Sequence, residues 1–285
     1  VSDGIAYVRL YGSLYALDTQ TGTLIWWKQT PTNISYNDSA PAVAYGMVYI
    51  GNYCDFYCGV VAYDAKTGEE KWQISLPRGA RGINVDNGVI YFGSDDWYVR
   101  AADALTGRIL WTSPQLNDGV TAVPAVANGK VFVGTWTGRV YALNETTGGI
   151  VWQTVIGGVM FSSPSIINDT LYIGSGMASV FAIDATTGGI KWEFNGAHDS
   201  VWGSPAVYNN MLYIQDLAGY IYALNTSTGS YILSYKTGAI PSSSYSSPAV
   251  ANGVVYVGSQ DKYLYALNAF TGVFLWKYQT AGSVN

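Results

Sequence analysis

Few residues in this sequence have a type and spacing that could perform chemistry. The chain holds one histidine, His198, and the two residues after it are Asp199 and Ser200. A nucleophilic triad needs these three groups brought together in space, and adjacency along the chain does not supply that relay. We therefore interpret His198 as a polar loop residue, and the sequence predicts no catalytic residue.

Four aspartates, in three loops expected to be equivalent, could bind Ca²⁺ if their carboxylates converged. They are Asp95, Asp96, Asp216 and Asp261. Because they are spread along the chain, solvated loop positions are the favoured interpretation, and we predict no metal site. The two cysteines, Cys54 and Cys58, form a C-x₃-C pair with no further Cys or neighbouring His to complete a zinc set. A local disulfide is favoured, with free thiols as the alternative, and a disulfide would indicate an oxidising compartment.

A repeat of about forty residues must position all of these groups. An eight-residue phrase with Ala at its second position, Asp or Asn at its fourth and Thr-Gly at its end returns seven times, at residues 15–22, 61–68, 100–107, 141–148, 181–188, 222–229 and 265–272. A Trp follows four residues after the closing glycine in six copies: Trp26, Trp72, Trp111, Trp152, Trp192 and Trp276. The copy at 222–229 has Leu233 instead.

Each repeat predicts four short strands. In the last copy, alternating β-branched and aromatic residues at 246–252, 254–259, 263–268 and 273–279 are separated by Asn-Gly and Thr-Gly turns. The Trp then lies on the outermost strand, where its ring can pack against the next blade. The sequence thus predicts an all-β, seven-bladed β-propeller of four-stranded antiparallel blades with Trp docking motifs, as a single domain over residues 1–285. Because the chain opens within a repeat, we expect it to be part of a longer chain, and either the first blade lacks its innermost strand or C-terminal residues supply it.

The phrase YALNAFTG with its Trp, preceded by SSPAVANGVVYVGS, resembles the repeat of the pyrroloquinoline-quinone-like (quinoprotein-type) β-propellers across the whole chain. That resemblance implies the fold and leaves the function open, because the family includes quinone-dependent dehydrogenases, an outer-membrane assembly lipoprotein that binds partners, and cell-surface modules. A dehydrogenase would imply pyrroloquinoline quinone and calcium as cofactors. The family's dehydrogenases have eight blades and often adjacent cysteines, which this chain lacks, so we expect no cofactor and carry over no catalytic residue.

One face of the predicted propeller varies between copies, and variable loops on a rigid scaffold are where binding residues gather. Aligning the copies on the inner-strand proline places Phe161, Trp202 and Tyr245 at one height in three consecutive blades, with Arg81 as the nearby cation and Trp136 in an adjoining loop. These five residues are candidates to line a ligand-binding channel mouth. The favoured interpretation is that the bulky side chains only fill the channel.

Composition restricts the function classes. The net charge of −5 and pI near 4.7 leave no basic stripe for nucleic acid, and no apolar run is long enough to span a membrane. Five Asn-x-Ser/Thr sequons, at Asn33, Asn37, Asn144, Asn168 and Asn225, are candidate glycosylation sites.

Three functions remain in view. The favoured one is a non-catalytic extracellular or cell-surface module, with the periplasm as the alternative location, that binds or assembles with other cell-envelope proteins or glycans. A quinone-dependent dehydrogenase and a carbohydrate-binding or adhesive module are the alternatives, so enzymatic activity is left open.

Overall fold

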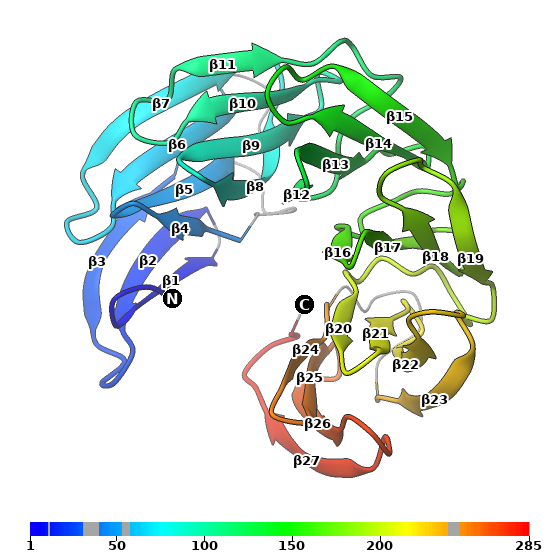
Figure 1. Cartoon of the computed structure of the whole chain (residues 1–285). Helices are drawn as coiled ribbons and strands as arrows, with labels where there is room; N and C mark the ends of the chain where they lie inside the picture. The colour runs from blue at the N-terminus through cyan, green and yellow to red at the C-terminus, as the bar shows by residue number, and fades with distance from the viewer. Residues whose placement is uncertain (11, 31–39, 53–57, 239–245, 285) are drawn as a thin grey trace. The chain divides into compact units, whose positions relative to one another are not determined.

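In a computed structural model, the chain is a seven-bladed β-propeller, which confirms the predicted fold class (Figure 1). The structure describes residues 1–10, 12–30, 40–52, 58–238 and 246–284. Within these residues all regular structure is β, and no helix of the kind that could cross a bilayer occurs. Six of the sheets have four antiparallel strands.

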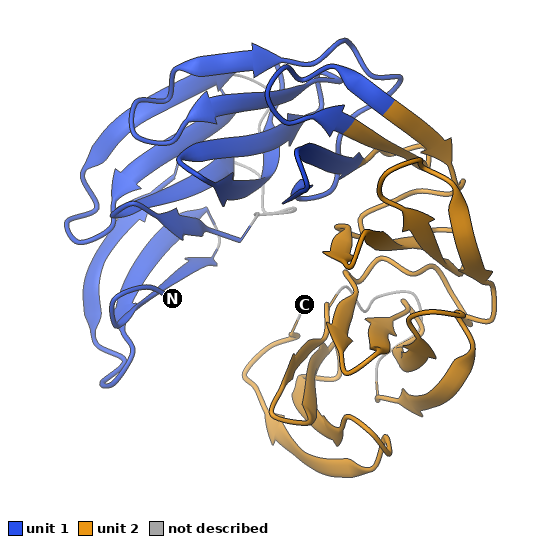
Figure 2. Cartoon of the chain, viewed as in Figure 1, with its two compact units in different colours: residues 1–133, 143–151 blue, residues 134–142, 152–285 orange. Residues whose placement is uncertain are grey.

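The strands fall into two compact units, residues 1–133 with 143–151, and residues 134–142 with 152–285 (Figure 2). The first unit contains blade 1, with β1 (Ile5–Leu10), β2 (Ser13–Asp18) and β3 (Leu24–Gln29). Blade 2 has β4 (Ala42–Ala44), β5 (Met47–Asn52), β6 (Cys58–Asp64) and β7 (Glu70–Leu76). Blade 3 has β8 (Ala80–Asp86), β9 (Val89–Ser94), β10 (Val99–Asp103) and β11 (Ile109–Thr112).

Blade 4 has residues in both units and comprises β12 (Ala125–Ala127), β13 (Lys130–Gly134), β14 (Arg139–Asn144) and β15 (Ile150–Val155). Blade 5, in the second unit, has β16 (Ser165–Ile167), β17 (Thr170–Ser175), β18 (Ser179–Asp184) and β19 (Ile190–Phe194). Blade 6 has β20 (Ala206–Tyr208), β21 (Met211–Gln215), β22 (Tyr220–Asn225) and β23 (Tyr231–Lys236). Blade 7 has β24 (Ala249–Ala251), β25 (Val254–Ser259), β26 (Tyr263–Asn268) and β27 (Phe274–Gln279).

Blade 1 differs from the other blades because its sheet has three strands in the described residues, in the order β1-β2-β3. Before β1 the chain makes only an isolated bridge between Ser2 and Ile5. In the second unit, the backbone N–H of Val284 donates to Ser259 and its side chain lies against Gly258. Val201 makes the same two contacts with Ser175 and Gly174 in blade 5.

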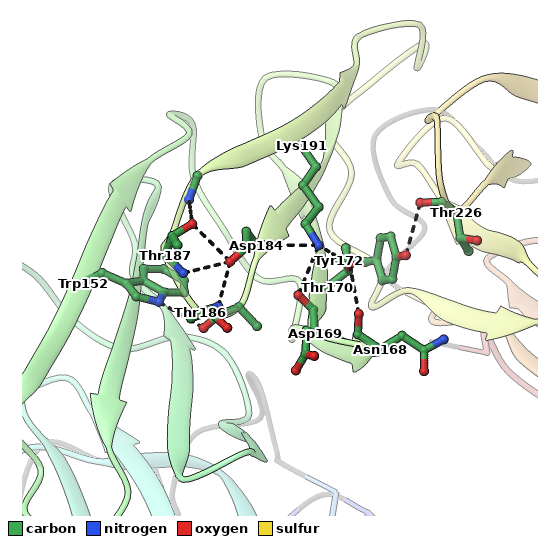
Figure 3. A network of polar contacts seen from close by, with 12 residues as sticks. Trp152, Asn168, Asp169, Thr170, Tyr172, Asp184, Thr186, Thr187, Lys191 and Thr226 are labelled. Carbon is green, nitrogen blue, oxygen red and sulfur yellow. Dashed lines mark hydrogen bonds and ion pairs between the residues drawn. The ribbon is translucent and has the colours of Figure 1, made fainter.

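The repeated phrase builds the turn between the third and fourth strand of each blade. In blade 5, Asp184 Oδ1 accepts hydrogen bonds from the backbone N–H groups of Thr186 and Thr187 and from the Thr187 hydroxyl (Figure 3). These bonds, the Thr187 N–H first among them, hold the pKa of Asp184 below its usual value. Gly188 then closes the turn at a φ of +78°, which glycine adopts without strain.

The Trp residues join consecutive blades through one carbonyl group each. The indole N–H donates to a backbone carbonyl oxygen of the following blade, that of the residue after the Asp or Asn of the repeated phrase. The pairs are Trp26 to Ala65 (2.9 Å), Trp72 to Ala104 (3.1 Å), Trp111 to Glu145 (2.8 Å), Trp152 to Ala185 (3.1 Å) and Trp192 to Thr226 (2.8 Å). Each of these rings also covers the closing glycine of that blade so tightly that a Cβ would not fit. Leu233 covers Gly272 in the same way, whereas Trp276 is 44% exposed.

Candidate binding surface

Three aromatic rings form a contiguous surface on the second unit. Trp136 lies in the loop between β13 and β14, Phe161 in the link from β15 to β16, and Trp202 in the link from β19 to β20. The ring centroids of Trp136 and Phe161 are 5.1 Å apart at 82°, and those of Phe161 and Trp202 are 4.7 Å apart at 64°. Trp136 is 42% exposed, while the other two rings are half-buried. We call these three residues the aromatic surface.

Close backbone packing fixes the loop that carries Trp136 to the link that carries Phe161. Gly138 donates its N–H to Thr135 and lies so near Gly157 that a Cβ on it would be 2.3 Å from that residue's carbonyl carbon. Gly157 and Gly158 both have positive φ, and Met177 packs against them. Met177 is itself 65% exposed and extends the apolar surface. The edge-to-face geometry of Trp136 and Phe161 requires that their two loops keep a fixed spacing. The close packing of these glycines provides that spacing.

Three serines, two of them close in sequence to the surface, are linked by hydrogen bonds: Ser163, Ser204 and Ser247. Ser163, two residues after Phe161, donates its backbone N–H to Ser204 Oγ at 3.0 Å. Ser204, two residues after Trp202, donates its backbone N–H to Ser247 Oγ at 2.8 Å. The hydroxyl groups of Ser204 and Ser247 thus serve as acceptors, and neither donates its own proton to another of the described residues.

The other two residues predicted for the channel mouth are Arg81 and Tyr245. Arg81 lies in the first unit, where its guanidinium makes two hydrogen bonds to the Asp95 carboxylate, at 3.0 and 3.1 Å. Both side chains are largely buried, so Arg81 holds the loop between β9 and β10 of its own blade. Tyr245 lies outside the described residues. The structure therefore brings together Trp136, Phe161 and Trp202 of the five.

The remaining aspartates considered for calcium have protein partners. Asp96 forms a buried ion pair with Arg100, and the carboxylate of Asp261 accepts the Tyr265 hydroxyl. Burial, followed by the hydrogen bond to Asp261, raises the pKa of Tyr265 to about 12. Among the residues that the structure describes, no three His, Cys, Asp or Glu side chains are grouped to hold a metal ion.

A buried carboxylate centre around Asp216 was not predicted. Asp216 is fully buried and accepts hydrogen bonds from the Tyr222 hydroxyl (2.8 Å) and the backbone N–H groups of His198 and Tyr220. The His198 ring lies 2.6 Å from the Tyr222 hydroxyl and is stacked on Tyr220 at 3.9 Å. Burial and the bond to Asp216 raise the pKa of Tyr222. Ser200 donates to the Gly176 carbonyl instead of to His198, so this centre organises a link and contains no nucleophilic relay.

The predicted modification sites have mixed outcomes. Cys54, Asn33 and Asn37 lie outside the described residues, so the Cys54–Cys58 disulfide stays a prediction; Cys58 is buried at the start of β6. The side chains of Asn144 and Asn225 hold repeat turns through their Oδ1 atoms. Asn168 lies at the exposed turn before β17, beside the Lys191 and Thr170 contact shown in Figure 3.

The fold and its repeat define the class of protein: a β-propeller of pyrroloquinoline-quinone-like repeats. A match to the family of the outer membrane protein assembly factor BamB covers the chain in overlapping segments, 1–84, 55–121, 95–239 and 197–285. The chain belongs to this family.

Curated relatives with different functions share the repeat. Tetrathionate hydrolase of Acidithiobacillus ferrooxidans is 28% identical over 56% of this chain and 28% of its own length. The quinone alcohol dehydrogenase subunit of Komagataeibacter europaeus is 29% identical over 55% of this chain and 25% of its own. BamB of Yersinia pestis is 30% identical over 33% of this chain and 26% of its own. The chain thus spans less than a third of the length of these relatives.

Among solved structures, BamB from Moraxella catarrhalis superposes with a TM-score of 0.70 at 22% identity, over 86% of this chain and 76% of that one. At this identity the likeness concerns the fold alone.

Proposed function

We propose that this propeller is a non-catalytic binding and assembly module of the cell envelope or cell surface, and that the aromatic surface is where it contacts its partner. The observation that carries the proposal is the exposure of Trp136 and Met177 beside Phe161 on a rigidly packed loop pair. Trp, Phe and Met are enriched at the cores of protein interfaces, and exposed apolar patches on otherwise polar surfaces mark such sites.

The chemistry of the charged groups supports a binding role. The acidic loop residues Asp95, Asp96 and Asp216 each make hydrogen bonds or ion pairs that shape the scaffold. The family match and the BamB relatives support a location in the cell envelope and a role in assembly, with the extracellular surface as the setting in which the predicted disulfide and glycans would persist.

A quinone-dependent dehydrogenase is the alternative that the Komagataeibacter relative supports. Mixing the purified protein with pyrroloquinoline quinone and Ca²⁺ tests it directly. Cofactor absorbance together with alcohol-dependent dye reduction would establish the alternative and overturn our proposal.

Photo-crosslinking tests the binding role. A photoreactive amino acid at Met177, which adjoins the aromatic surface, should give a discrete crosslinked species in envelope preparations of the source organism. The same probe at Tyr278, which is 67% exposed on β27, is the matched control and should give none. Equal crosslinking from both positions, or none from either, would refute a partner at this surface.

A further inference from the structure

The segments that build the aromatic surface contain no ionisable Asp, Glu, Lys or Arg. This holds for residues 131–138, 155–168 and 200–215, and for residues 246–260, which include Ser247. A charged ligand would have to leave water without gaining an opposite charge, which is costly. A neutral ligand incurs no such cost, so the composition of these segments selects against anions, cations and nucleic acid.

The surface combines two complementary kinds of group. Trp136 presents a large apolar face to solvent, and the edge of Phe161 fixes its orientation at 82°. The hydroxyl groups of Ser204 and Ser247 accept backbone N–H bonds, and neither donates its own proton to another of the described residues. Binding sites for small molecules typically pair aromatic walls with a few placed polar groups that set orientation.

A pyranose ring matches both kinds of group. Its axial C–H bonds form an apolar face that can lie on an indole ring, while its equatorial hydroxyl groups supply neutral acceptors around the rim. We propose that the aromatic surface binds a neutral saccharide chain, with one ring stacked on Trp136 and hydroxyl oxygens of further rings facing Ser204 and Ser247. This inference rests on the proposed binding function and names the ligand class of the same surface.

The test uses two neutral probes whose ring substituents are equatorial, cellotetraose and chitotetraose. Tryptophan fluorescence and calorimetric titrations of the whole chain should show saturable binding of at least one. Trp136→Ala should weaken that binding about tenfold or more, because a stacked ring contributes at least about 1.4 kcal/mol. Trp136→Phe, which keeps an aromatic face, should recover part of the affinity. Circular dichroism checks that each variant keeps its fold.

Trp97→Ala is the matched control. Trp97 occupies the loop of blade 3 that corresponds to the Trp136 loop, and it is 44% exposed against 42% for Trp136. It belongs to the first unit, whereas the three rings of the aromatic surface belong to the second, so we expect its removal to leave the saccharide affinity unchanged. Equal losses in Trp97→Ala and Trp136→Ala would overturn the assignment, since binding would then depend on exposed tryptophans in general.

Failure of this inference is distinguishable from failure of the proposed function. If neither saccharide binds while Met177 crosslinks to an envelope protein, the saccharide inference is refuted and the binding role stands. If neither saccharide binds and Met177 gives no crosslink, both are refuted.

Discussion

Replacing Leu233 by Trp should stabilise the seam between blades 6 and 7. Leu233 already contacts the closing glycine of blade 7, as each Trp does in the other seams. A Cβ on Gly272 would be 2.9 Å from Leu233, close to the 2.8 Å and 2.6 Å at which Gly188 and Gly229 meet their Trp rings. Leu233 therefore contacts its glycine about as closely as the Trp rings contact theirs.

The acceptor for the indole N–H is also present. In the preceding seam, the Thr226 carbonyl accepts both the Tyr172 hydroxyl (3.2 Å) and the Trp192 indole (2.8 Å). In the seam after blade 6, the Ala269 carbonyl accepts the Tyr213 hydroxyl at 2.8 Å, and Leu233 has no N–H to add. A Trp at position 233 would supply the second donor.

The expected gain follows from these two contributions. The hydrogen bond is worth about 1 kcal/mol. The larger ring buries roughly 60 Å² more apolar surface, which at about 25 cal/mol per Å² adds about 1.5 kcal/mol. Adjustment of neighbouring side chains to a larger residue opposes this by about 1 kcal/mol. We expect Leu233→Trp to raise the free energy of unfolding by about 1.5 kcal/mol.

Urea unfolding followed by circular dichroism measures the effect without interference from the added fluorophore. Leu233→Phe adds area but no donor and should give less than half of the gain. Trp192→Leu makes the converse change in the preceding seam and should cost about 2 kcal/mol. If Leu233→Trp lowers the urea midpoint, or if Trp192→Leu leaves it unchanged, the account of the seams is wrong.

Three further predictions concern buried polar groups. Asp95→Ala should cost about 3 kcal/mol because it removes the carboxylate that pairs with the largely buried Arg81 guanidinium, whereas Glu69→Ala, which removes an exposed pair, should change the urea midpoint hardly at all. Gln215→Leu should raise the free energy of unfolding by about 1 kcal/mol and the thermal midpoint with it. The reason is that the Gln215 carboxamide is fully buried with no hydrogen-bond partner among the described residues. A lower midpoint would show that the amide has a partner. Burial raises the pKa of Tyr213 and of Tyr265 to about 12, against about 10 in an unfolded chain. Their stabilising contribution is therefore complete below pH 10 and falls as the pH rises towards 12. A urea midpoint that is flat across that window would contradict this prediction.

The sequence predicted the blades because the repeat specifies them locally. The Asp or Asn, Thr and Gly of each phrase form one turn by bonds within a few residues, so spacing alone locates the turn and its flanking strands. Aligning the copies on the inner-strand proline also placed Phe161 and Trp202 together, because equivalent positions of regular blades lie at one height. The ion pair between Arg81 and Asp95 was missed, since it joins an inner strand to a loop whose length varies between copies.

One position near the end of the second strand of each blade is glycine in most copies and differs in two. In blades 2, 3, 4, 5 and 7 the second strand ends in Gly followed by Ser, Thr or Asn: Gly51, Gly93, Gly134, Gly174 and Gly258. This glycine is required where the next link packs on it, since a Cβ on Gly174 would be 2.5 Å from the Val201 carbonyl oxygen.

Arg9 in blade 1 and Gln215 in blade 6 take the place of this glycine. Arg9 reaches across to the Gly51 carbonyl and the Asn52 side chain of blade 2, whereas Gln215 is enclosed without a partner among the described residues. The stretch from the docking residue to the inner-strand proline runs from 26 to 41 after blade 1 and from 233 to 248 after blade 6, against 152 to 164 after blade 4. The two blades that lack this glycine are therefore also the two that are followed by the longer stretches of sequence.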